Sequence, residues 1–159
     1  MSTMSSPVAV IDALNSLLEA EFNSIFRFMG EGSPYVSRAD ADLRRRLQEL
    51  IETNHRHAAE IADLVEHLGG VPHEGGAGPE DQYLAYLSLK FLMPKLVEAK
   101  KLCVRRYLNT IASIGENPPD DVGEVLQRHL AELRLELADL QKASDQVLAN
   151  RDKPSPVAG

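Results

Sequence analysis

Residues 41–68 read ADLRRRLQELIETNHRHAAEIADLVEHL, and this stretch decides the fold. Its apolar residues recur at alternating steps of four and three, the heptad spacing of a helix that packs along one face. The seam consists of Leu43, Leu47, Leu50, Asn54, His57, Ile61, Leu64 and Leu68. Asn54 and His57 interrupt it at mid-helix. The pattern therefore predicts two polar side chains that point into a helical core.

The rest of the chain predicts three more long helices and no strands. Apolar spacing predicts helices over about residues 7–29, 81–114 and 122–149, separated by loops rich in glycine, proline and polar residues. Pro94 falls inside the third of these helices, where we expect a kink or a break. The sequence thus predicts an all-α protein: a four-helix up-down bundle at residues 7–149, with flexible tails at 1–6 and 150–159.

Composition excludes several classes of protein. The 159 residues suit one domain with its own core. A net charge of −7 offers no basic surface to nucleic acid, and no apolar run approaches the roughly 18 residues of a membrane span. Cys103 is the only cysteine, which excludes an internal disulfide framework, and the N-terminal residues show no secretory signal. We therefore expect a cytoplasmic protein that binds neither nucleic acid nor membrane.

Polar side chains also interrupt the seams of the first and last helices. Glu21 fills a gap in the apolar spacing of the first helix, and His129 shares a stripe with Leu126 in the last. A buried carboxylate or imidazole is costly unless it is paired or binds a metal ion. With Asn54 and His57, these residues leave two interpretations open: a hydrogen-bonded polar core or an inherited metal site.

Three segments of the chain resemble bacterioferritin and other ferritin-like proteins. They are IDALNSLLEAEF in the first helix, NHRHAAEIADLVEHLGGVP in the second and LQRHLAELRLELADLQKA in the last. The resemblance covers about residues 11–148 and implies a four-helix bundle with a crossover connection between helices two and three. It places Glu21, His57 and His129 on metal-ligand positions of the family. Family members hold two metal ions, usually iron, with four carboxylates and two histidines, and they oxidise Fe(II) for storage or reduce oxygen or peroxide.

The chain departs from this family at three ligand positions. Asn54 and Leu126 stand where the family has the glutamates of its Glu-x-x-His motifs. The glutamate position of the third helix falls on Lys95, or on Lys100 if the register slips by five residues. A lysine about 5 Å from a divalent cation is repelled by roughly 7 kcal/mol at an effective dielectric constant near 20. Lys95 paired with Glu21 would instead supply the positive charge that metal ions supply in the family.

These departures predict a polar core with no bound cofactor, and a binding or structural role rather than an enzymatic one. The expected cluster consists of Glu21, Asn54, His57, Lys95 and His129. The alternative is a metal-dependent oxidase, peroxidase or iron-storage protein that binds iron or another divalent metal at a rearranged or mononuclear site. Glu21, His57 and His129 have the composition of a 2-His-1-carboxylate site. The alternate ligands are Glu52, His55, Glu98 and Glu132.

The chain also favours a small assembly. Ferritin-like shells of 24 subunits commonly carry a short fifth helix, whereas two prolines stand among residues 154–159 of this chain. Leu17, Phe22 and Phe26 are expected on the outer face of the first helix, where exposed aromatic side chains favour a partner surface. We therefore expect a homodimer or another small homo-oligomer.

Overall fold

Helices make up all the regular secondary structure that the computed structural model describes. The described residues are 6–29, 41–73, 89–119 and 121–152. The helices within them are α1 (Pro7–Phe22), α2 (Ile25–Met29), α4 (Ala41–His67), α5 (Leu89–Ile114) and α6 (Val122–Asp152). The all-α prediction is confirmed. The predicted start of the third long helix, near residue 81, lies outside the described residues, and α6 continues to Asp152, past its predicted end.

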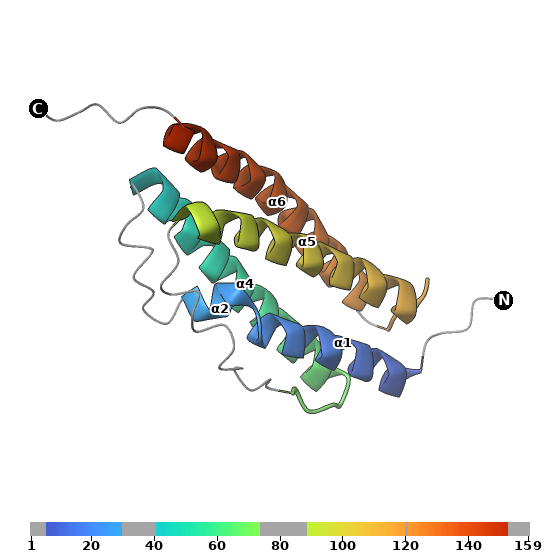
Figure 1. Cartoon of the computed structure of the whole chain (residues 1–159). Helices are drawn as coiled ribbons and strands as arrows, with labels where there is room; N and C mark the ends of the chain where they lie inside the picture. The colour runs from blue at the N-terminus through green and yellow to red at the C-terminus, as the bar shows by residue number, and fades with distance from the viewer. Residues whose placement is uncertain (1–5, 30–40, 74–88, 120, 153–159) are drawn as a thin grey trace, which may run out of the picture.

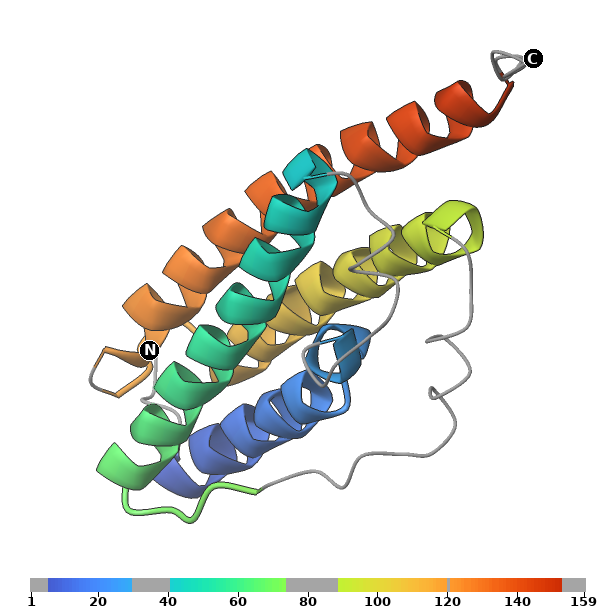
Figure 2. The ribbon, with the colours of Figure 1, turned by 90° about the vertical axis from the view of Figure 1, so that its left-hand side faces the viewer.

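The four long helices lie side by side around a common core. In both views of the ribbon, α4 and α5 run in the same direction, and α1 and α6 run against them (Figures 1 and 2). α1 contacts α4 and α5, and α6 contacts the same two helices. α4 and α5 therefore lie at opposite corners of the group. Polar residues on the inner faces of the four helices are thereby directed toward one another.

The first predicted helix is two helices rather than one. The chain leaves the helical path at Asn23 and Ser24, where α1 ends and the short α2 begins. Ser24 Oγ accepts a hydrogen bond of 3.2 Å from the backbone N–H of Phe26, which caps the start of α2. The prediction of one helix over residues 7–29 is wrong because the apolar spacing continues across the break. Ile25 and Phe26 are both buried, as they would be in an uninterrupted helix.

One apolar core fills the space between the helices. Its side chains without exposed surface include Val10, Leu14, Leu18, Leu47, Ile61, Leu92 and Leu96. Leu17 and Phe26 belong to this core as well, with 3% and 1% of their surface exposed. Phe22 is half-buried, and the guanidinium carbon of Arg27 lies 4.3 Å from its ring centre. The expected outer face of the first helix is therefore wrong, because α1, which carries Leu17, and α2, which carries Phe26, both pack against α4 and α5.

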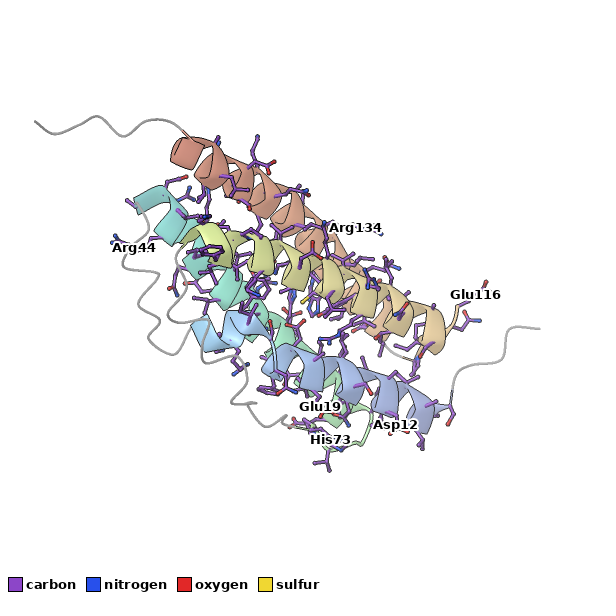
Figure 3. The ribbon with its side chains drawn as sticks, viewed as in Figure 1. Asp12, Glu19, Arg44, His73, Glu116 and Arg134 are labelled. Carbon is purple, nitrogen blue, oxygen red and sulfur yellow. The ribbon has the colours of Figure 1, made fainter. Side chains whose placement is uncertain are left out.

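The chain that leaves α4 is fastened to α1. Gly69 has a φ of +88°, a conformation that glycine adopts without strain. Beyond this turn, Asn15 of α1 donates a hydrogen bond of 3.1 Å to the carbonyl of Val71 and accepts one of 2.9 Å from the backbone N–H of His73. Figure 3 shows His73 on the α1 side of the molecule. These bonds fix the end of α4 against the first helix.

Pro94 does not break α5, which is continuous from Leu89 to Ile114. Of the two expected outcomes, a kink or a break, the break does not occur: Pro94 removes one helical hydrogen bond, and the helix continues past it. Met93 and Leu96, on either side of Pro94, have no exposed surface.

No helix in the described part of the chain is long and apolar enough to span a membrane.

Candidate functional site

Four of the polar residues singled out in the sequence are buried in the middle of the molecule. Glu21 comes from α1, Asn54 and His57 from α4, and His129 from α6. Their exposed fractions are 4%, 4%, 0% and 0% in that order. They form two neighbouring groups, one around Glu21 and Asn54 and one around the two histidines. Each group also contacts residues that do not lie on the apolar seams.

The first group begins with a hydrogen bond between α1 and α4. Asn54 Nδ2 lies 2.7 Å from Glu21 Oε2 and 3.2 Å from the backbone oxygen of Glu21, so the amide donates to both. Glu21 stands in the last turn of α1, where backbone carbonyls lack their usual helical partners. The asparagine therefore binds the glutamate and helps to close the end of α1. Among the described residues, Asn54 Oδ1 has no hydrogen-bond partner.

The lysine of this group is Lys100, not Lys95. Lys100 is 2% exposed, and its Nζ lies 3.3 Å from Glu136 Oε1 of α6 and 4.1 Å from the centre of the Phe26 ring. Lys95 lies on the exposed side of α5. Five residues turn a helix by about 140°, so the two lysines occupy different faces. The prediction of Lys95 in the cluster is wrong, and the buried lysine is Lys100, the alternative position in the sequence.

Electrostatics couples Lys100 to both buried carboxylates. Burial raises the pKa of Glu21, and the positive charge of Lys100 and the hydrogen bond from Asn54 oppose that rise. Burial likewise raises the pKa of Glu136, again opposed by Lys100. Two carboxyl groups thus share one buried ammonium. For each carboxylate, the charge of Lys100 is the largest influence that opposes burial.

The second group consists of two stacked imidazoles clamped by carboxylates. The rings of His57 and His129 lie 3.8 Å apart between centroids, with planes inclined by 15°. His57 Nε2 lies 3.2 Å from Glu132 Oε2 of α6, and His129 Nε2 lies 3.2 Å from Glu60 Oε2 of α4. Each histidine therefore pairs with a glutamate on the other helix, and the exchange joins α4 to α6.

Arginines complete this exchange. Arg56 of α4 bonds Glu132 of α6, and Arg128 of α6 bonds Glu60 of α4. Both glutamates are half-buried, and both arginines are about half-exposed. The sequence explains the symmetry: residues 56–60 read RHAAE and residues 128–132 read RHLAE. We call the six side chains that these repeats contribute the Arg-His-x-x-Glu clasp: Arg56, His57, Glu60, Arg128, His129 and Glu132.

Burial keeps both imidazoles of the clasp neutral. Loss of solvent, followed by the charge of His129, lowers the pKa of His57 to about 3. Burial also lowers the pKa of His129. Hydrogen bonding from Arg56 is the largest influence on Glu132 and lowers its pKa to about 2. At neutral pH the clasp therefore pairs two arginine cations with two glutamate anions, and the neutral rings fill the space between them.

Tyr107 of α5 joins the histidine pair. Its hydroxyl lies 2.9 Å from His129 Nδ1, and the tyrosine has no exposed surface. Burial raises its pKa, so the phenol stays protonated. The contact fixes the orientation of the His129 ring. His57 Nδ1, by contrast, is buried without a hydrogen-bond partner among the described residues.

The remaining candidate ligands lie apart from both groups, except Glu132. Glu52 and His55 are exposed on α4. Glu98 is exposed on α5 and pairs with Lys101 at 3.4 Å. Leu126 is 1% exposed and belongs to the apolar core. Within the described ranges, no group of three or more His, Cys, Asp or Glu side chains is arranged to hold a metal ion.

The sequence did not point to Glu60, Tyr107 or Glu136. A signal for Glu60 was present, because the repeated RHxAE string places a glutamate three residues after each inward histidine. Such a glutamate lies on the same helix face as the histidine. Tyr107 and Glu136 carry no comparable signal in the chain.

No protein-family model, curated protein or solved structure matches this chain.

Proposed function

We propose that this chain is a ferritin-like four-helix bundle whose second and third long helices are joined by a crossover connection. The parallel course of α4 and α5 at opposite corners of the group supports this topology (Figure 2). The position of Glu21, His57 and His129 on inner faces of three helices supports the family register. A reducing, cytoplasmic location is part of the proposal, supported by the free, buried thiol of Cys103.

In this proposal the bundle has a binding or structural role and no ferroxidase activity. The observation that carries it is Lys100, a buried ammonium that lowers the pKa of both Glu21 and Glu136 against the effect of burial. We infer that it takes the place that metal ions have in the family. An ammonium 5 Å from a divalent ion costs about 7 kcal/mol at an effective dielectric constant near 20. The lysine therefore satisfies the carboxylates and excludes the ions. The donor set does not fit a dinuclear iron centre.

The clasp also opposes metal binding in this proposal. Both imidazole Nε2 atoms already face carboxylates at 3.2 Å, and each carboxylate is bonded to an arginine. A metal ion would have to displace these arginines before it could reach a glutamate oxygen. The groups that remain are suited to holding α4 and α6 together.

The alternative function is that of a metal-dependent oxidase, peroxidase or iron-storage protein with a mononuclear site. The observation that favours it is the neutral state of His57 and His129, since neutral imidazole is the form that binds metal. Glu60 and Glu132 would be the nearest carboxylate ligands. Iron or another divalent ion would then be the cofactor.

Metal analysis separates the two functions. Protein purified from iron-supplemented cells should contain well under one iron per chain and should not accelerate Fe(II) oxidation. Two tightly held irons per chain with rapid oxidation would refute the proposal. One ion per chain that is lost in His57→Gln would establish the alternative.

A double variant tests whether Lys100 occupies the former metal position. Lys100→Glu combined with Asn54→Glu restores two family carboxylates and should raise the affinity for Fe(II) or Co(II) by at least tenfold. The matched control is Lys101→Glu with His55→Glu, which makes the same charge changes on the same two helices at the partly exposed Lys101 and the exposed His55. Equal affinities in the two variants would mean that the helices are not in the proposed register.

A further inference from the structure

A cavity of about 460 Å³ lies beside the break between α1 and α2. Residues 23–25 form one wall, and the face of α5 between Pro94 and Arg106 forms the other. The break creates this hollow, because Asn23 and Ser24 leave the helical path that would otherwise continue along α5. Small-molecule sites commonly have volumes of about 300–1,000 Å³. The cavity has the volume of about fifteen water molecules, at about 30 Å³ each, which is enough for a small organic ligand.

A second hollow of about 430 Å³ adjoins the first along the groove between α1 and α5. Asn23 and Arg106 line both hollows. The Arg106 guanidinium therefore stands where the two meet. No hydrogen bond or ion pair joins Arg106 to the rest of the described chain, and its side chain is exposed. Its positive charge lowers the pKa of Glu21 and of Cys103, although burial dominates both groups.

The body of the first cavity is apolar. Ile25 and Leu102 line it, as does the buried Cys103. Burial raises the pKa of Cys103 to about 12, so the thiol is neutral and behaves as an apolar surface. Glu98 also lines the cavity, but its carboxylate pairs with Lys101 at 3.4 Å. Lys95 and Arg106 also line the cavity, so cationic side chains outnumber the carboxylate of Glu98 in an otherwise apolar hollow.

We propose that this cavity binds a medium-chain fatty carboxylate. The carboxylate head pairs with Arg106 beside the amide of Asn23, since a guanidinium binds a carboxylate through two parallel hydrogen bonds. The alkyl chain extends over Ile25, Leu102 and Cys103. The positive charges of Lys95 and Arg106 and the negative charge of Glu98 leave a net charge of one at the wall, which favours a monoanion over a dianion. This inference is independent of whether the bundle core holds a metal.

Calorimetric titration with decanoate tests the proposal on the full-length protein. Decanoate should bind saturably with one site per chain, and decanol, which has the same chain without the charge, should bind at least tenfold more weakly. Arg106→Gln should weaken decanoate binding at least tenfold and leave decanol unchanged. Arg105→Gln is the matched control, because Arg105 is exposed on the same helix and does not line the cavity.

Cys103 reports where the ligand lies, because it is the only cysteine of the chain. Bound decanoate should slow alkylation of Cys103 at pH 9 at least fivefold, and Leu102→Trp, which fills the cavity, should abolish both decanoate binding and the protection. Absence of saturable binding would overturn the proposal. Equal affinity for decanol, or undiminished affinity in Arg106→Gln, would overturn it as well.

Discussion

Replacing Lys100 by methionine should leave the carboxyl groups of Glu21 and Glu136 without the buried ammonium that compensates them. Methionine keeps most of the length of the side chain and removes its charge. Lys100 Nζ lies 3.3 Å from Glu136 Oε1, and two unit charges at that separation attract by about 5 kcal/mol at an effective dielectric constant near 20. Removing one partner of a buried pair costs about 3–5 kcal/mol. We therefore expect Lys100→Met to lose about 3–5 kcal/mol of unfolding free energy at pH 7.

The pH dependence of this loss gives the sharper test. Burial raises the pKa of Glu21 and of Glu136 above the unfolded values, and Lys100 opposes that rise. Without the lysine both values rise further, so the folded variant takes up protons more readily than the unfolded chain as the pH falls. The difference in stability between the wild type and Lys100→Met should shrink between pH 7 and pH 5. Histidine titration is common to both proteins and cancels in that difference.

Urea denaturation at pH 7 and pH 5 measures these differences. Lys101→Met is the matched control, because Lys101 is 43% exposed and its ion pair with Glu98 is a surface pair worth at most about 1 kcal/mol. If Lys100→Met does not fold at pH 7, its recovery at pH 5 reports the same coupling. A loss equal to that of Lys101→Met, or a loss that is the same at both pH values, would refute the reasoning.

Three further outcomes are expected. Because the pKa of His57 is about 3 in the folded chain and about 6.5 when unfolded, the unfolded chain takes up protons first as the pH falls, so stability decreases below about pH 6.5; urea melts should show a smaller decrease for His57→Gln than for the exposed control His55→Gln. Asn15→Ala should cost about 1–3 kcal/mol through two lost hydrogen bonds, with exposed Ser16→Ala near zero in the same melts. Light scattering should give the mass of a dimer or another small oligomer; a mass near 24 chains, or a strict monomer, would contradict this.

The helices could be predicted because periodicity reports burial directly. Leu47, Asn54, His57 and Ile61 occupy seam positions, and all four are buried. The break after Phe22 could not be found in this way, since buried residues continue at nearly helical spacing on both sides of it. Asn-Ser at positions 23 and 24 was the local signal, because both residues favour helix ends over helix interiors.

The candidate site could be predicted only in part, and the errors have a common cause. Glu21, Asn54, His57 and His129 interrupt seams within their own helices, so one helix at a time suffices to place them inside. The position of Lys95 depends instead on the register of the third long helix, which follows a connection whose length the pattern does not fix. A shift of five residues turns that choice from an exposed lysine into a buried one.

The apolar pattern of one helix does not predict which side chains form hydrogen bonds or ion pairs with another helix. Glu60 and Glu132 lie at the edges of their apolar faces, where a half-exposed glutamate is ordinary. Their partners stand 68 to 76 residues away in the chain. Tyr107 resembles any other aromatic core residue until its hydroxyl is seen to contact His129. Only the doubled RHxAE string connects two of these residues in the sequence itself.

The Arg-His-x-x-Glu clasp is self-complementary, and this has a consequence for assembly. Either helix carries a full set of donors and acceptors, so an antiparallel pair of two identical copies would satisfy the same bonds as α4 with α6. The clasp residues are the same on both helices, so they do not determine which helix takes the position of α4 and which takes that of α6. Three residues before each histidine the repeats differ, with Asn54 in one and Leu126 in the other. Asn54 binds Glu21 of α1, whereas Leu126 packs among apolar side chains. The hydrogen bond between Asn54 and Glu21 therefore distinguishes the position of α4 from that of α6 in the bundle.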